Sequence, residues 1–326
     1  NIPLKANRIT GKAMYYYLVF GFTDTAWISI ENSKKIRKYF QLKVFSAWHI
    51  LTRVFNETQV HKKLVLRYVK LSENNKIKLA NKLKKKKERD KTGLALIEGI
   101  HLIDEAFKSN MMIKQLFVIE PERTDSRLLE YAKEAYEINM KVAESLSGTI
   151  TPQGFFAVIE KPKHDISKAK QVLLLDRIQD PGNLGTLIRT ADAAGIDMIV
   201  MEKGTADAYQ DKVMRASQGS VFHIPIVTTE LNKFIEQFDG PVYGTALENA
   251  VSYKNIESQD TFALLLGNEG EGVNKELLAH TSQNLIIPIY GKAESLNVAI
   301  AGSILLYHLK GWPFDLKSTI LNCIQN

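Results

Sequence analysis

The 326-residue chain has a single cysteine, Cys323, and it has no apolar run long enough to span a bilayer as a helix. One thiol cannot close an internal disulfide, which favours a reducing, cytoplasmic setting. Residues 13–22 form an apolar run of ten residues that includes three tyrosines. A run of that length and composition predicts neither a membrane span nor a secretory signal.

The signatures of several common ligand sites are also missing. No GxxxxGK[ST] motif occurs, which argues against a phosphate loop. The seven histidines and the one cysteine are scattered, so no metal site is expected. Gly267, Gly270 and Gly272 follow the order GxxGxG rather than GxGxxG, and they come late in the chain. A doubly wound, nicotinamide-dependent oxidoreductase is therefore disfavoured.

The net charge of +7 is unevenly distributed. Residues 61–91 hold thirteen Lys and Arg against three acidic residues, so the rest of the chain is slightly acidic. A compact basic segment beside a balanced body indicates a polyanion partner, because phosphate neutralisation releases counterions. A solvated, lysine-rich helix is the plainer interpretation. The densest cations are Lys84, Lys85, Lys86, Lys87 and Arg89.

Hydrophobic patterning predicts two α/β units. The smaller one has expected strands at 93–99, 115–119 and 154–160 and expected helices at 100–107 and 126–138. A polar, proline-bearing linker at 161–168 follows it. From residue 171, unbroken apolar runs alternate with amphipathic segments, which is typical of a mostly parallel sheet covered on both faces. The predicted divisions are an unassigned extension at 1–70, domains at 71–165 and 166–312, and a tail at 313–326.

Three polar, glycine-bearing segments in the second unit each follow an apolar, strand-like run. They are Asp180–Gly185 with Arg189 beyond it, Gly267–Gly272, and Ile287–Asn297. Loops at strand ends of an α/β sheet are where such folds bind ligands and carry out chemistry. Glycines alone could serve only close packing or a positive φ, so the set of three segments is more informative than any one of them.

In this order and with these residues, the segments resemble the three motifs of the SpoU (TrmH-like) family of RNA ribose 2'-O-methyltransferases. The resemblance covers residues 85–311 and implies a SPOUT domain with a trefoil knot, which hydrophobic periodicity cannot show. It also implies that the unit at 71–165 binds RNA, with ribosomal RNA favoured over transfer RNA. The charge of the cations listed above makes them the expected RNA phosphate contacts. A homodimer through the knotted domain is expected, with the apolar face of the last helix at the interface: Val298, Ala301, Ile304, Leu305 and His308.

The resemblance further implies S-adenosylmethionine as the cofactor. Its expected contacts are Gly267, Ile287, Leu296, Thr245 and Leu247. The expected catalytic residues are Arg189, Asn183, Glu269, Ser295 and Asn297.

Arg189 matches the arginine to which the family assigns activation of the 2'-hydroxyl. A guanidinium is almost never deprotonated, so binding the adjacent phosphate or stabilising a developing alkoxide fits its chemistry better than a base role. A plain ion pair with Asp192 is the alternative. Asn183 suits orientation of ribose or of Arg189, and it could equally cap a helix. A non-catalytic RNA-binding protein with the same fold is the competing function.

Overall fold

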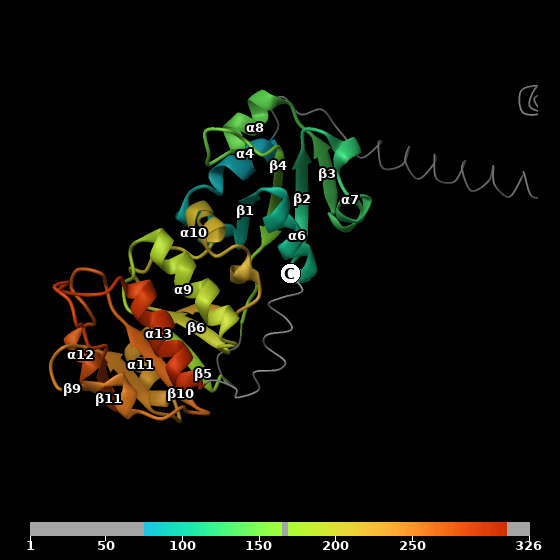
Figure 1. Ribbon diagram of the computed structural model, residues 1–326. Helices are drawn as coiled ribbons and strands as arrows, with labels where there is room; N and C mark the ends of the chain where they lie inside the picture. The colour runs from blue at the N-terminus through green and yellow to red at the C-terminus, as the bar shows by residue number, and fades with distance from the viewer. Residues whose placement is uncertain (1–74, 165–168, 312–326) are drawn as a thin grey trace, which may run out of the picture. The chain divides into compact units, whose positions relative to one another are not determined.

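The computed structural model describes residues 75–164 and 169–311. The extension expected at 1–70 and the tail expected at 313–326 lie outside these residues, as does part of the predicted linker. The described chain contains two β-sheets with their helices (Figure 1). No helix within these residues is long and apolar enough to cross a membrane.

The first sheet has four strands in the order β1-β4-β2-β3. β4 pairs antiparallel with both β1 and β2, whereas β2 and β3 are parallel. Phe117 and Phe156 are fully buried in its core together with residues of α4 and α8. The elements of this unit are α4 (Asn75–Lys82), α5 (Lys86–Thr92), β1 (Leu94–Glu98), α6 (Ile100–Lys108), β2 (Ile113–Val118), α7 (Ser126–Tyr131), β3 (Glu134–Glu137), α8 (Met140–Leu146) and β4 (Phe155–Glu160).

The expected helix at 126–138 is wrong in its second half. Helix α7 ends at Tyr131, and residues 134–137 form β3, which adds to the edge of the sheet beside β2. Ala135 and Tyr136 are buried there, and the Tyr136 ring stacks on Phe117 with a centroid distance of 5.5 Å. The partners of β3 come from elsewhere in the chain, and a short strand cannot be told from a helix end by local spacing alone.

The second sheet has seven strands in the order β7-β6-β5-β10-β8-β11-β9. Every strand pair in it is parallel, which confirms the predicted fold class. All residues of β5 and β10 are buried, as unbroken apolar runs predict for central strands. The strands are β5 (Gln171–Leu175), β6 (Met198–Met201), β7 (Ile226–Thr228), β8 (Val242–Thr245), β9 (Ala250–Ser252), β10 (Phe262–Leu266) and β11 (Gln283–Ile286).

Helices cover both faces of this sheet. α11 and α12 pack against one face through a cluster that includes Phe234, Leu277 and Val172. α9 and α13 lie on the other, where a Cβ at Gly302 would meet Leu266 and Leu187 at 2.5 and 2.7 Å, so glycine lets α13 approach closely. The helices are α9 (Pro181–Ala193), α10 (Asp211–Ala216), α11 (Leu231–Gln237), α12 (Lys275–Leu278) and α13 (Val298–Lys310).

The face of α13 expected at a dimer interface is only partly available. Leu305 is buried within its own subunit, and the His308 Nε2 lies 2.7 Å from the Ile256 carbonyl oxygen. The large apolar side chains of α13 that are exposed are instead Ile300 and Tyr307. They are seven residues apart, two helical turns, and therefore share one face.

Candidate active site

The three predicted motifs meet at the carboxyl edge of the parallel sheet. The chain leaves β5 into Asp176 and leaves the neighbouring strand β10 into Gly267. From β5 the chain continues through α9 to β6 on one side, whereas from β10 it continues through α12 to β11 on the other side. The β5–β10 pair is therefore a topological switch point. Ligands of open parallel sheets bind in the crevice at such a point.

Helix α9 begins at Pro181, three residues before Leu184. The Asp180 carboxylate accepts a hydrogen bond from the Asn183 backbone amide at 2.8 Å, and Pro181 occupies the first turn. Asp180 is thus the N-cap. The alternative in which Asn183 caps this helix is therefore wrong, and the Asn183 side chain is left for contacts beyond the helix.

A chain of amide and carboxylate contacts joins the three motifs. The Asn183 Nδ2 donates to Glu269 Oε1 at 3.0 Å, and the Asn297 Nδ2 donates to Asn183 Oδ1 at 2.8 Å. The Glu269 carboxylate also accepts from the backbone amides of Gln179 and Asp180, both at 3.2 Å. We call Glu269, Asn183 and Asn297 the motif triad. Residues separated by up to 114 positions in sequence are brought into contact here.

The hydrogen bonds fix the charge of Glu269. Burial opposes ionisation of this carboxyl, but the hydrogen bonds from Asn183 and from backbone amides outweigh it and lower its pKa. Glu269 is therefore an ionised acceptor at neutral pH. Asn297 has a second task, because its Oδ1 accepts from the backbone amides of Ala299 and Ile300 and caps α13.

Arg189 stands apart from the motif triad. It is exposed on α9, and within the described residues no hydrogen bond or ion pair joins its guanidinium to another side chain. The alternative pairing with Asp192 is absent, because the Asp192 carboxylate lies 2.9 Å from His223 Nδ1 instead. Ser295 is also exposed and is not brought to the triad by any contact. The guanidinium is therefore available to a bound substrate.

The second motif forms a tight loop. Asn268 and Gly272 exchange backbone hydrogen bonds of 3.1 and 2.9 Å, which places Glu269 in the turn between them. A Cβ at Gly267 would lie 2.1 Å from the Val273 nitrogen, and Gly272 has a φ of +72°. Both positions therefore require glycine, and the loop holds backbone groups where a ligand could reach them.

The other expected cofactor contacts lie at the ends of neighbouring strands. Thr245 ends β8 and donates to the Leu265 carbonyl at 3.2 Å, and Ile287 directly follows β11. Leu247 and Leu296 are exposed although they are large and apolar. Exposed apolar side chains beside backbone polar groups suit a ligand that has a flat aromatic base and a polar tail. The residues thus fit S-adenosylmethionine.

A chain of ion pairs that sequence patterns did not predict joins the first two motifs. Asp176 is buried and lies 2.9 Å from Arg177 Nε, while Arg177 Nη1 lies 2.6 Å from Glu271 in the second motif. The hydrogen bond to Asp176, followed by that to Glu271, raises the pKa of Arg177. Asp176 also accepts from the Asn274 amide at 2.8 Å. The one sequence feature that could have marked these residues is that Asp176 and Arg177, two opposite charges, directly follow the apolar run of β5.

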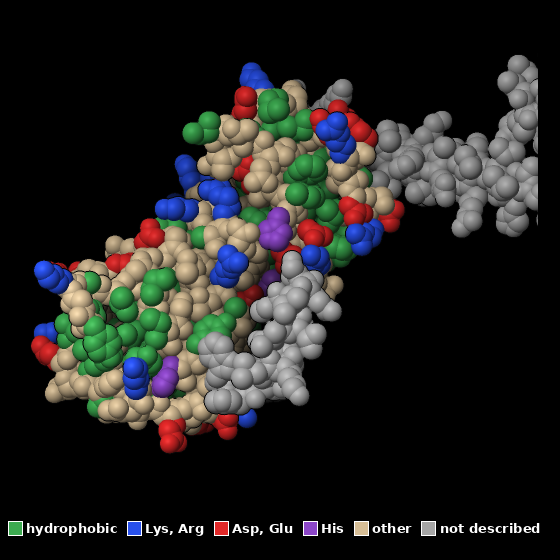
Figure 2. All heavy atoms as spheres, in the orientation of Figure 1, with side chains coloured by type: hydrophobic (Ala, Val, Ile, Leu, Met, Phe, Trp, Pro, Cys, Tyr) green, Lys and Arg blue, Asp and Glu red, His purple; other side chains and the backbone are tan. Residues whose placement is uncertain are grey.

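The side chains of the basic segment differ in their contacts. Residues 84–87 are all exposed, but the Lys84 ammonium also donates to the carbonyl oxygens of Ser145 and Ser147 at 2.7 and 3.0 Å. Burial, only partly offset by Glu98 and Asp211, lowers the pKa of Lys84. Figure 2 shows Lys and Arg side chains gathered on the visible face near α10.

The prediction that Arg89 contacts RNA is wrong. It is buried, lies 2.6 Å from Asp207, and donates to the carbonyl oxygens of Leu83 and Lys84. The Arg89 guanidinium is fully occupied by partners inside the protein, so it cannot contact RNA phosphates. No group of three or more His, Cys, Asp or Glu positioned to hold a metal ion occurs in the described part of the chain.

Fold and site together define a class of protein: a parallel α/β sheet with three polar loops converging at its switch point, preceded by a small α/β domain. Comparison with known proteins specifies the class. Residues 170–307 match the SpoU rRNA Methylase family, and residues 74–157 match the MRM3-like substrate binding domain. A Bacillus subtilis 23S rRNA (guanosine(2553)-2'-O)-methyltransferase is 46% identical over 249 residues, which are 76% of this chain and all of the relative.

Solved structures of similar proteins are also methyltransferases. An AdoMet-bound rRNA methyltransferase from Sinorhizobium meliloti has 32% identity and a TM-score of 0.68, with 75% of this chain and 98% of that chain covered. The SpoU methyltransferase AviRb of Streptomyces viridochromogenes, in complex with AdoMet, has 25% identity and a TM-score of 0.65, with 73% and 97% covered. The chain belongs to the SpoU family of rRNA methylases. It is an enzyme that methylates RNA ribose 2'-hydroxyls with S-adenosylmethionine, not a non-catalytic RNA-binding protein.

Proposed function

We propose that this enzyme methylates the ribose of a guanosine in 23S ribosomal RNA. The observation that carries the proposal is the 46% identity to the Bacillus subtilis enzyme over that relative's whole length. Ribosomal RNA is accordingly favoured over transfer RNA. A cytoplasmic location suits a substrate of this kind and a chain with one cysteine.

The proposed chemistry depends on Arg189. S-adenosylmethionine supplies an electrophilic methyl group when it is bound. The ribose 2'-hydroxyl passes its proton to solvent as it attacks, so negative charge grows on its oxygen. A permanently charged guanidinium cannot accept that proton, but it stabilises the charged oxygen. Arg189 is exposed on the helix that the first motif begins, and it has no competing partner within the described residues.

The motif triad has a positioning role in this proposal. Asn183 uses its amide donor on Glu269 and its amide acceptor on Asn297, so the three loops are held as one unit. One N–H and one lone pair of Asn183 remain for a ribose hydroxyl. Ser295, two residues before Asn297, is exposed at the start of α13 and suits a contact to cofactor or RNA.

The cofactor is proposed to lie against Gly267, Ile287, Leu296, Thr245 and Leu247. These residues follow three neighbouring strands, β10, β8 and β11, so their loops adjoin one another. We also propose that this domain has the trefoil knot expected of a SPOUT domain. Such a knot would enclose the ligand between these loops.

The proposed oligomer is a homodimer through the methyltransferase domain. Ile300 and Tyr307 expose apolar surface on α13, and Figure 2 shows hydrophobic side chains gathered on the visible face around α12 and α13. Such surface is uncommon on a monomer unless it binds something. Sedimentation at micromolar concentration should show a dimer, and a fully active monomer would contradict this part.

The test of the proposed target uses labelled cofactor. Tritiated methyl groups from S-adenosylmethionine should enter ribosomal RNA purified from a strain that lacks the enzyme, and mapping should find one 2'-O-methylguanosine in 23S RNA. The matched control is RNA from the unmodified strain, which is already methylated and should accept little label. Label that enters only transfer RNA would refute the target.

A further inference from the structure

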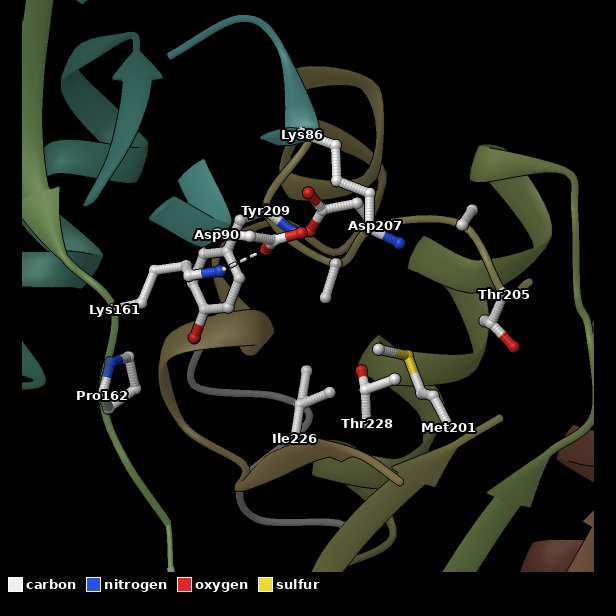
Figure 3. A pocket seen from close by; sticks show the side chains of 12 residues that line it. Lys86, Asp90, Lys161, Pro162, Met201, Thr205, Asp207, Tyr209, Ile226 and Thr228 are labelled. Atoms are coloured by element: carbon white, nitrogen blue, oxygen red, sulfur yellow. Dashed lines mark hydrogen bonds and ion pairs between the residues drawn. The ribbon is translucent and has the colours of Figure 1, made fainter. Parts of the chain in front are cut away.

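A cavity of about 240 Å³ lies beside the first motif rather than within the three-loop site. Its walls come from α5, from residues 161–162 after β4, and from β6, β7 and the loop at 205–209. Figure 3 shows Met201, Ile226 and Thr228 along one side and Lys86, Asp90 and Asp207 on the opposite side, with Lys161 and Tyr209 beside them.

The cavity has an apolar floor and a polar mouth. Met201, Ala208 and Tyr209 are buried, whereas Lys86, Asp90 and Thr228 are exposed. An aromatic and aliphatic floor with a few polar groups is the usual lining of a small-ligand site.

The charges at the mouth favour an anion. Asp90 is neutralised by Lys161 at 3.1 Å, and Asp207 is neutralised by the buried Arg89 at 2.6 Å. Lys86 has no hydrogen bond or ion pair to another described residue. Its ammonium therefore leaves the cavity with an uncompensated positive charge, which suits a phosphate.

Two hydrogen bonds connect the cavity wall to the segment that leads into the active site. The Ala206 amide donates to the Ile178 carbonyl at 2.8 Å, and the Thr205 hydroxyl donates to the Leu175 carbonyl at 3.2 Å. Leu175 ends β5, and Ile178 lies two residues before Asp180, the N-cap of the helix α9 that carries Asn183. A nucleotide in the cavity would consequently lie against the segment between β5 and α9.

We propose that the cavity binds one unpaired base of the substrate RNA, close in sequence to the methylated nucleotide, with Lys86 on its phosphate. The proposal rests on the RNA methyltransferase function and extends it to a second nucleotide. Drug-sized ligands occupy roughly 300–1,000 Å³, so a cavity of about 240 Å³ suits a single base. Proteins that read RNA commonly take splayed-out bases into such pockets.

The test fills the cavity. Thr228→Trp in the full chain places a large ring at the mouth, Thr228→Ser keeps the space open, and Gln237→Trp adds the same ring at an exposed position of α11 outside the cavity. Thr228→Trp should raise the KM for ribosomal RNA about tenfold with the cofactor Kd and the melting temperature unchanged. Thr228→Ser and Gln237→Trp should behave as wild type.

Abasic substitutions make the test specific. In an RNA fragment that is methylated, removing the base at one position near the target should raise the wild-type KM about tenfold and should have no further effect on Thr228→Trp. An unchanged KM for Thr228→Trp, or effects that simply add at every position, would overturn the proposal. A lowered melting temperature with normal RNA kinetics would overturn it too, because the ring at position 228 would then disturb packing without displacing RNA. If ribosomal RNA is not methylated at all, the proposed target fails, and the same cycle on the RNA that is methylated still decides the cavity.

Discussion

The three-loop site and the basic segment differ in how their charges are used. At the site, Glu269, Asn183 and Asn297 come from three distant segments and bind one another. In the basic segment, adjacent cations have different roles. Arg89 is buried against Asp207, and the exposed Lys84 binds carbonyl oxygens, whereas Lys85–Lys87 are exposed without such contacts. Motifs at strand ends meet because the parallel sheet aligns those ends. Nothing comparable fixes the directions in which neighbouring side chains of a run of like charges point.

The largest effect expected from this comparison is the loss of stability on removing Arg89. Arg89→Met leaves the mostly buried Asp207 carboxylate without its partner, which costs up to about 3–5 kcal/mol. Urea unfolding should show this loss, and Lys91→Met on the exposed side of the same helix should show almost none. Adding Asp207→Asn to Arg89→Met should recover part of the stability. A fully stable Arg89→Met protein with weakened RNA affinity would restore Arg89 as an RNA contact.

The motif triad predicts a graded loss of activity. Asn183→Ala removes the connection between the loops, and small misplacements of catalytic groups can cost up to about 100-fold in rate. Asn183→Asp should be worse, since it sets a second carboxylate against Glu269, which Asn183 contacts at 3.0 Å. The rate of methyl transfer at saturating substrates measures both. Asn255→Asp, on an exposed turn, is the control, and equal rates for Asn183→Ala and Asn183→Asp would contradict the geometry.

The exposed lysines predict a smaller, electrostatic effect. Replacing Lys85–Lys87 by Gln should reduce the log-log salt slope of RNA binding by about 2–3 if all three contact phosphates. Lys84→Gln should change the slope less, because its ammonium is held by carbonyl groups. Glutamine at the exposed Lys141, Lys254 and Lys275 serves as the matched control. Equal slopes for both triple variants would make Lys85–Lys87 a merely solvated surface.

The smallest effect concerns pH. The folded pKa of Glu269 lies below the ordinary glutamate value of about 4.3, so its hydrogen bonds stabilise the loop above that pH. The contribution is lost as the pH falls through the folded value. Wild-type cofactor affinity should therefore weaken on acidification below about pH 4.3, and Glu269→Gln should lack this step. Identical acid profiles for the two proteins would contradict the assignment.

Much of this fold can be predicted from sequence because its central strands are unbroken apolar runs. β5 and β10 are such runs, and every residue in them is buried. β3 was missed, since it is a short strand at a sheet edge, and its partner β2 lies elsewhere in the chain. The resemblance named Glu269, Asn183 and Asn297, whose catalytic role stays a prediction, but it did not predict their mutual contacts. Asp176 and Arg177 had no motif to mark them, and burial of Arg89 depends on Asp207, 118 residues away.

The most direct test of the account is single-turnover methyl transfer by Arg189→Ala. With saturating S-adenosylmethionine and unmethylated ribosomal RNA, the rate should fall about 100-fold to 1,000-fold, because a group aimed at transition-state charge is lost. The cofactor Kd from calorimetry should match wild type, since Arg189 is proposed to act on ribose. A near-normal rate, or a loss of rate explained by lost cofactor binding, would contradict the central role given to Arg189.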